Sequence, residues 1–273
     1  MTTITFLGTG EAFDPNRSTT SYLIENNIAQ TLMVDCGYDS PKSLMRYLKK
    51  HGKSVADVPN SLLFTHEHGD HFGGLPALLM PIWEEVNGIV GKRKDSLQRK
   101  IEIASAHEYL LLRVEQAMET DYKGFFERFK KEGPDISLRA LKAEGDVIRG
   151  FRIRAALTSH GAPNFAYRFD DIDGKSFAIS GDGAFTDASR ELFSGTNLLI
   201  HEGFNVLGSG GKNHASIEQV VDYAVTTSIP RAYIVHVNRE EREKLDDIEK
   251  MRQKADSAGV ELFIAEDHQT VEL

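Results

Sequence analysis

The chain of 273 residues has 41 acidic and 32 basic side chains, a net charge of −9. This acidic excess argues against a long nucleic acid as partner, because gripping a phosphate backbone requires a net basic face. No apolar run approaches the ~20 residues of a membrane span, so we expect no membrane segment. A single cysteine, Cys36, excludes an intrachain disulfide and favours a reducing, cytoplasmic location. Its place at a predicted strand end indicates a buried structural thiol.

Short strands and helices alternate through the first third of the chain. Asn26-Asn27 predicts a hairpin turn between two of the strands. Ser40 and Pro41 predict the start of a helix, as its N-cap and first residue. The expected strands cover residues 3–7, 21–25, 31–35, 61–65 and 101–104, and the expected helices cover 40–50 and about 75–85.

A helical insert is expected at about residues 83–135. A polar stretch from 86 to 100 comes first, and Ser105 then predicts the cap of a helix that contains His107, which we take as structural. An aromatic and apolar stripe follows, made of Tyr109, Leu112, Met118, Tyr122, Phe125, Phe126 and Phe129. Such a stripe is typical of a core or a dimer face. A lid over the active site is the alternative interpretation.

Strand patterns return in the second half of the chain. The expected strands cover residues 137–141, 147–158, 164–169, 176–180, 197–201, 232–236 and 260–265, and the expected helices cover 187–193, 215–226 and 240–258. We find no internal repeat or linker, so we expect one domain over residues 1–273. Strands in both halves, each set followed by helices, predict two sheets sandwiched between helical layers.

A dense polar run follows the expected strand 61–65. Its potential ligands are His66, His68, Asp70 and His71. Burying them unpaired would cost roughly 2–7 kcal/mol for each neutral group, whereas Zn²⁺, Mn²⁺ or Fe²⁺ accepts imidazole nitrogen and carboxylate oxygen. In extended backbone His66 and His68 point the same way and can reach one ion. Asp70 and His71 follow a turn and can reach a second ion. The alternative is a solvated, histidine-rich loop.

This run, His66-Glu67-His68-Gly69-Asp70-His71, resembles the HxHxDH signature of the metallo-β-lactamase superfamily. The signature follows an apolar strand and precedes a helix, as it does here, and Gly73-Gly74-Leu75-Pro76 also resembles the family. The resemblance implies an αββα sandwich, in which two mixed β-sheets are flanked by helices.

Three further polar residues come at the ends of expected strands and match the superfamily in order. They are His160, Asp182 and His236. Taken alone, either histidine is more typical of a satisfied core residue. The resemblance implies two divalent ions held by seven side chains: His66, His68 and His160 at one ion, Asp70, His71 and His236 at the other, and Asp182 bridging both.

The ligand set also indicates a reaction. Two ions ~3.5–4 Å apart can share a bridging water and lower its pKa toward ~7, which supplies a hydroxide nucleophile at neutral pH. We expect Asp70 to orient this nucleophile in addition to ligating. Iron-dependent oxygen-reducing relatives carry Glu where this chain has His68, so the resemblance implies a hydrolase. Zinc is the expected metal, with manganese or iron as alternatives that the same ligands accept.

A second constellation lies at Glu202, after a strand end, and at His214, on a glycine-rich loop. Cleaving a phosphodiester expels an alkoxide, so a general acid is worth ~10²–10⁴ in rate. We expect His214 to be that acid and Glu202 to hold its imidazole protonated. Lys212 and the following helix N-terminus suit a phosphate. The alternative is a mobile surface loop with an incidental histidine.

The segments around Glu202 and around His214 resemble the HEAT-type and GHS-type motifs of ribonuclease Z. Phe6-Leu7-Gly8-Thr9-Gly10 and Asp35-Cys36-Gly37 also resemble that family, so the likeness spans most of the chain. Two departures argue against tRNA maturation. The interval from His160 to Asp182 is short where ribonuclease Z inserts a tRNA-gripping arm, and Gly203 stands where its motif has Ala. The compact cyclic phosphodiesterases of phosphonate breakdown are an equally fair comparison.

The sequence therefore predicts a binuclear metal-dependent phosphodiesterase for a small or nucleotide-like substrate. The alternatives are a lactone, thioester or β-lactam hydrolase, a ribonuclease Z-like tRNA 3′ endonuclease, and a non-catalytic metal-binding scaffold. A homodimer built on the helical insert is a further prediction. We expect His51 and His268 to be surface residues outside the site.

Overall fold

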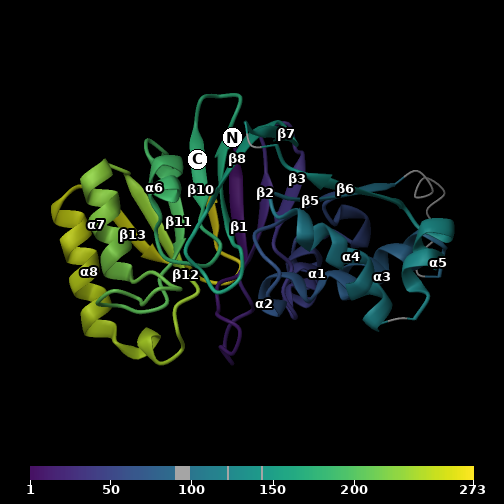
Figure 1. The fold of residues 1–273 in the computed structure, drawn as a ribbon, viewed down its shortest axis with the longest axis horizontal. Coiled ribbons are helices and arrows are strands. Elements are labelled where there is room, and N and C mark those ends of the chain that lie inside the picture. Colours follow the sequence, from purple (N-terminus) through teal and green to yellow (C-terminus); the bar gives the residue numbers. More distant parts are fainter. Residues whose placement is uncertain (90–98, 122, 143) are drawn as a thin grey trace.

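The computed structural model describes residues 1–89, 99–121, 123–142 and 144–273. Two seven-stranded mixed sheets face each other, and helices cover their outer faces (Figure 1). The first sheet has the order β14-β1-β2-β3-β4-β5-β6 and the second β13-β12-β11-β10-β9-β8-β7. The structure thus confirms the αββα sandwich of the metallo-β-lactamase fold.

Each sheet is antiparallel on one side and parallel on the other. In the first sheet the pairs from β3 to β6 are parallel, and in the second the pairs from β10 to β13 are parallel. The strands of the first sheet are β1 (Thr3–Gly8), β2 (Ser21–Glu25), β3 (Thr31–Val34), β4 (Ser61–Phe64), β5 (Lys100–Ser105), β6 (Asp135–Ala140) and β14 (Thr270–Glu272). Those of the second are β7 (Asp146–Ile148), β8 (Phe151–Leu157), β9 (Phe165–Asp170), β10 (Ser176–Ile179), β11 (Leu198–Glu202), β12 (Arg231–Val235) and β13 (Glu261–Ile264).

The helices divide between the two outer faces (Figure 1). Beside the first sheet lie α1 (Ser40–Lys50), the 3₁₀ turn η1 (Val55–Asp57), α2 (Gly69–Phe72), α3 (Leu75–Val86), α4 (Glu108–Asp121) and α5 (Phe125–Glu132). Beside the second lie α6 (Asp187–Phe193), α7 (Ile217–Thr227), the 3₁₀ turn η3 (Glu241–Glu243) and α8 (Leu245–Ser257). None of the helices in the described ranges is long and apolar enough to cross a membrane.

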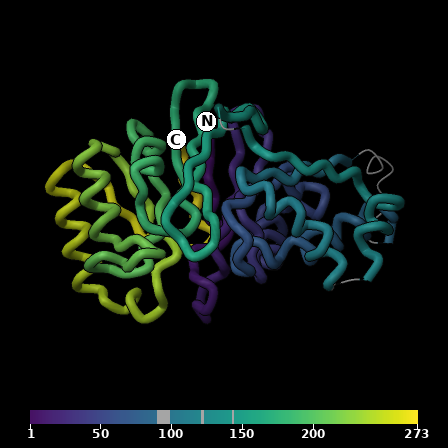
Figure 2. Tube along the Cα trace, in the orientation of Figure 1, coloured from purple at the N-terminus to yellow at the C-terminus, as the bar shows by residue number. Residues whose placement is uncertain are grey.

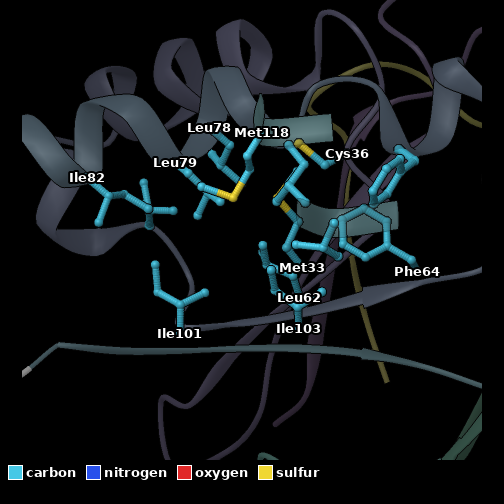
Figure 3. Packing of buried hydrophobic residues seen from close by; sticks show 14 of the residues in the cluster. Met33, Cys36, Leu62, Phe64, Leu78, Leu79, Ile82, Ile101, Ile103 and Met118 are labelled. Atoms are coloured by element: carbon cyan, nitrogen blue, oxygen red, sulfur yellow. The ribbon is translucent and has the colours of Figure 1, made fainter. Parts of the chain in front are cut away.

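Apolar side chains fill three layers: one between the sheets, and one between each sheet and its helices. Figure 3 shows part of the layer under α3 and α4, where Cys36 packs among leucine and isoleucine side chains. Cys36 is fully buried, as predicted, and burial raises the pKa of its thiol. It is therefore a packing residue.

The aromatic stripe of the expected insert is only partly buried. Met118, Phe125, Phe126 and Phe129 are buried in the layer beside the first sheet, which favours the core interpretation for them. Tyr109 and Leu112 are exposed. Tyr122 and residues 90–98 lie outside the described residues. The dimer face, the lid and the insert's limits stay predictions.

Several expected elements were wrong in detail. The single strand expected at 147–158 is a hairpin of β7 and β8, because Arg149 and Gly150 both have positive φ (48° and 79°), as a tight hairpin turn requires. Asp39, one residue before Ser40, is the N-cap of α1. The helix expected at 240–258 breaks at Lys244 into η3 and α8.

The C-terminal tail holds two further differences. Its residues 270–272 form β14, which pairs with β1 and brings the chain ends together (Figure 2). His268 is not a free surface residue: it is partly buried, and its Nε2 lies 2.8 Å from the Ser43 hydroxyl. His51 is exposed at the end of α1, as expected.

Leu79 tests the layer under α3, where its side chain is fully buried. We expect Leu79→Ala to lower the free energy of unfolding by about 2–5 kcal/mol, because it removes buried contacts and leaves a cavity. Leu112→Ala on α4, where the side chain is 74% exposed, is the matched control and should change it by less than about 0.5 kcal/mol. Denaturant unfolding measures both, and equal effects would contradict this packing.

Candidate metal centre

Loops that follow four strands bring the predicted metal ligands to one place. The residues they carry are His66 and His68 after β4, His160 after β8, Asp182 after β10, and His236 after β12. The short helix α2 begins immediately after His68 and supplies Asp70 and His71. Such loops at strand ends are where folds with buried sheets place their ligands.

The seven side chains form two groups, and Asp182 belongs to both. Within each group the potential ligand atoms lie within 4.8 Å of one another. The groups are His66, His68, His160 with Asp182, and Asp70, His71, His236 with Asp182. The structure therefore brings together every residue that the sequence named as a ligand.

The Asp182 carboxylate is the centre of the cluster. Its Oδ2 lies 3.4 Å from His236 Nε2 and 3.8 Å from His66 Nε2. His160 Nε2 lies 3.9 Å from the same oxygen, and His71 Nε2 lies 3.3 Å from Oδ1. Most of these distances exceed hydrogen-bond length. The histidines thus surround the carboxylate with their ring nitrogens facing it, most of them farther from its oxygens than a hydrogen bond would allow.

Three buried polar atoms of the cluster have no hydrogen-bond partner among the residues that the structure describes: His66 Nε2, His71 Nε2 and Asp182 Oδ1. A buried group left unpaired costs about 1–3 kcal/mol. Divalent cations at the two groups would satisfy all three atoms, because imidazole nitrogen and carboxylate oxygen are their usual ligands. The residues present therefore fit a metal site.

The charge states of most of the candidate ligands also suit a bound cation. Burial lowers the pKa of His66 well below its usual value, and burial likewise lowers the pKa of His160 and of His236. These imidazoles are neutral at pH 7 and keep a lone pair for a metal. Burial alone would raise the pKa of Asp182, but His236 and His71 outweigh it and hold that pKa well below its usual range.

His71 differs from the other histidines. Burial disfavours its charged form, but the carboxylates of Asp182 and Asp35 outweigh burial and raise its pKa well above the usual value. Its Nδ1 lies 2.8 Å from Asp35 Oδ2, so a proton there is retained when Nε2 binds a cation.

The turn that carries Asp182 requires glycine on both sides. Gly181 and Gly183 have φ of 60° and 113°. A Cβ on Gly181 would lie 2.4 Å from the Asn164 side-chain oxygen. His236 adopts a left-handed conformation without being glycine, with φ of 55°. Such a conformation costs of order 1–3 kcal/mol and is typical of functional sites.

Asp35 contacts Thr65, just before the HxHxDH run, and His71, at the end of the run. No role was assigned to it from the sequence. It accepts hydrogen bonds from the Thr65 backbone N–H and hydroxyl, each 2.8 Å long, as well as the contact from His71. The Thr65 hydroxyl also lies 3.0 Å from His66 Nδ1. The sequence did hold one sign of this role, because Asp35 directly follows a strand, as most of the candidate ligands do.

Asn164 was also missed. It is fully buried, and its amide donates to the Ser180 carbonyl and the Thr158 hydroxyl while its oxygen accepts from the Asp182 N–H. It therefore fixes the turn that presents Asp182. In the sequence it begins an ordinary strand pattern, and nothing distinguishes it there.

His214 and Glu202 meet beside the metal ligands. His214 Nδ1 lies 3.1 Å from Glu202 Oε1, which also accepts from the backbone N–H groups of Gly183 and Ala215. The His214 ring stacks on Phe204, with ring centres 4.4 Å apart, and its centre lies 5.1 Å from that of His160. Burial alone would lower the pKa of His214, but Glu202 outweighs it and raises that pKa.

Known proteins resemble this chain in sequence over most of its length. It is 25% identical to ribonuclease Z of Haloarcula marismortui, over 97% of this chain and 94% of that protein. It is also 25% identical to the anti-Pycsar protein Apyc1 of Bacillus phage 010DV004, over 85% of this chain and 88% of that protein. The protein-family model described as anti-Pycsar protein Apyc1 matches residues 2–89.

Solved structures show the same fold. The metallo-β-lactamase fold protein YhfI from Bacillus subtilis superposes with a TM-score of 0.74 at 17% identity, over 99% of this chain and 98% of that one. Human tRNase Z, short form, superposes with a TM-score of 0.71 at 21% identity, over the same shares. This chain is a metal-dependent hydrolase with the metallo-β-lactamase fold. Among its sequence relatives it is similar to ribonuclease Z.

Removing metal from this hydrolase should lower its melting temperature. A ligand that binds only the folded state stabilises it by about 4 kcal/mol at 1,000 times its Kd. Differential scanning fluorimetry of chelated protein, with and without added Zn²⁺ or Mn²⁺, measures the effect. His236→Ala should abolish most of the metal-dependent shift, and His51→Ala, an exposed histidine, should retain it. An equal shift in both variants would contradict the assigned ligands.

Asp35→Asn should weaken metal binding without removing a ligand. Loss of a partner that orients a ligating histidine costs about 10–100-fold in metal affinity, and His71 loses its carboxylate partner in this variant. Competition with a fluorescent chelator measures the affinity. An unchanged affinity in a folded variant would show that the Asp35–His71 contact does not orient the ligand.

Proposed function

We propose that this hydrolase is a binuclear metal-dependent phosphodiesterase acting on a small or nucleotide-like phosphodiester. Zinc is the expected metal, with manganese or iron as alternatives. The observation that carries the proposal is the His214–Glu202 hydrogen bond beside the candidate ligands. An acid placed there suits a substrate whose leaving group needs a proton, as the alkoxide of a phosphodiester does.

Two groups of residues would hold the ions, with Asp182 shared between them. Divalent ions bound there would supply Lewis acidity toward the phosphate and would make a water acidic enough to attack at neutral pH. His66, His160 and His236 keep neutral nitrogens directed at the centre. Asp70 is the residue we propose to orient the attacking water, since its carboxylate borders the second group 3.6 Å from His71 Nε2.

His214 is the proposed general acid. Its Nδ1 is engaged by Glu202, so Nε2 is the nitrogen left to give a proton to the departing oxygen. Glu202 is fully buried and accepts three backbone N–H groups, from Gly183, Phe204 and Ala215. These bonds fix the carboxylate and, through it, the ring. Lys212, exposed on the same loop, offers a positive charge to the phosphate.

A small substrate is favoured over tRNA. The residues between His160 and Asp182 form β9, β10 and a short turn, which leaves no arm in that interval. The net charge of −9 also opposes a long polyanion. The names of the relatives support phosphate chemistry, since they include ribonucleases Z and a diphosphatase of the PhnP family. The homodimer and the cytoplasmic location stay predictions.

Replacing His214 separates this proposal from a lactone or thioester hydrolase. We expect His214→Ala to lower kcat about 10²–10⁴-fold for substrates with an alkoxide leaving group, such as cyclic nucleotides, because that oxygen must be protonated. The loss should be much smaller for bis(p-nitrophenyl) phosphate, whose phenolate departs without a proton. Steady-state kinetics on metal-loaded protein compares the two.

Two results would contradict the proposal. Wild-type protein with full metal content that leaves every phosphodiester intact but hydrolyses lactones or thioesters would favour the alternative class. Equal losses on both phosphodiesters in His214→Ala would remove the role of general acid from His214.

A further inference from the structure

A cavity of about 410 Å³ lies between α2 and α4. This volume falls in the range of small-molecule pockets, ~300–1,000 Å³. Its wall includes Glu67 and Gly69, which alternate with the candidate ligands of the HxHxDH run. The cavity is therefore lined by direct chain neighbours of the candidate ligands.

Tyr38 forms one wall of this cavity and is 66% exposed. Its ring lies against the backbone of Gly69 and Gly73. A Cβ on Gly69 would come within 1.7 Å of the Tyr38 hydroxyl, and one on Gly73 within 2.6 Å of a ring carbon. Both glycines are thus needed to seat the ring. An exposed aromatic ring held this way is a ready platform for stacking, at little further cost in side-chain entropy.

The charges that line the cavity cancel. Glu67 from the HxHxDH run and Arg113 from α4 both line it, and they form an ion pair with a closest distance of 3.4 Å. A second phosphate would meet the Glu67 carboxylate as well as the guanidinium, which disfavours an anion here. Gln116, exposed one turn along α4, adds an amide with both donors and an acceptor. The cavity therefore combines a ring platform with neutral hydrogen-bonding capacity.

We propose that this cavity binds the base of a nucleotide substrate, with Tyr38 stacking on the ring and Gln116 bonding to its edge. A nucleobase is a flat, uncharged, polar heterocycle, which matches each feature of the lining. The inference rests on the proposed phosphodiesterase function and deepens it: the phosphodiester is held at the metal centre, and the attached nucleoside extends toward α4. Tyr38 would be a specificity-determining residue with no part in the bond cleavage.

The test uses two substrates with the same leaving group. One is thymidine 5′-(p-nitrophenyl phosphate) and the other is methyl p-nitrophenyl phosphate, which lacks a nucleoside. The readout is the ratio of their kcat/KM values on metal-loaded, full-length protein, so any general loss of activity cancels. Base stacking on an aromatic side chain is worth ~1–3 kcal/mol, so Tyr38→Ala should lower the ratio about 5- to 150-fold.

Three further variants isolate the ring as the cause. Tyr38→Phe keeps the ring and should keep the ratio within about twofold, since stacking needs no hydroxyl. Ile172→Ala removes an equally exposed apolar side chain (67%) in the turn between β9 and β10 and should leave the ratio as in the wild type. Gln116→Ala should change the order of preference among the corresponding esters of the four bases.

The outcomes distinguish this inference from the proposed function. If wild-type protein hydrolyses neither ester, the phosphodiesterase proposal fails. If it hydrolyses both with similar kcat/KM, or if Tyr38→Ala leaves the ratio unchanged, the base-binding cavity is wrong and the phosphodiesterase proposal stands. A ratio that falls in Tyr38→Ala but not in Tyr38→Phe or Ile172→Ala supports the cavity.

Discussion

One buried carboxylate organises the site. Asp182 stands within 4 Å of nitrogens from four histidines that come from three separate segments of the chain. Burial of so many polar groups is unfavourable unless they share a cation. The turn at Gly181 and Gly183, together with hydrogen bonds between Asn164 and the backbone of Ser180 and Asp182, holds this residue in place. Much of the local architecture therefore positions one negative charge among the imidazoles of four histidines.

The two sheets make this convergence possible. Each sheet changes from antiparallel to parallel pairing, at β3 in the first and at β10 in the second. The loops that leave the parallel strands β4, β10 and β12 deliver ligands from both sheets to one place. Left-handed conformations at Asp35 and His236, each after a strand, mark where the backbone departs from its relaxed geometry. The surrounding hydrogen bonds and packing offset that strain.

The sequence predicted the fold and the candidate ligands partly from local signals and partly from its resemblance to the metallo-β-lactamase superfamily. An apolar strand followed at once by His66, or by Asp182 between two glycines, is visible without any tertiary contact. Asp35, Asn164 and Tyr38 were not assigned, because their roles depend on partners more than ten residues away. The hairpin at Arg149 was hidden in a run with the composition of one long strand, and β14 was too short to recognise before its pairing with β1 was known.

The number of metal ions per chain shows whether Asp182 is shared between two ions, and elemental analysis of purified protein measures it. We expect two divalent ions per chain in the wild type and at most one in Asp182→Ala, because that carboxylate belongs to both groups of ligands. A folded Asp182→Ala protein that retains the full wild-type metal content would contradict it.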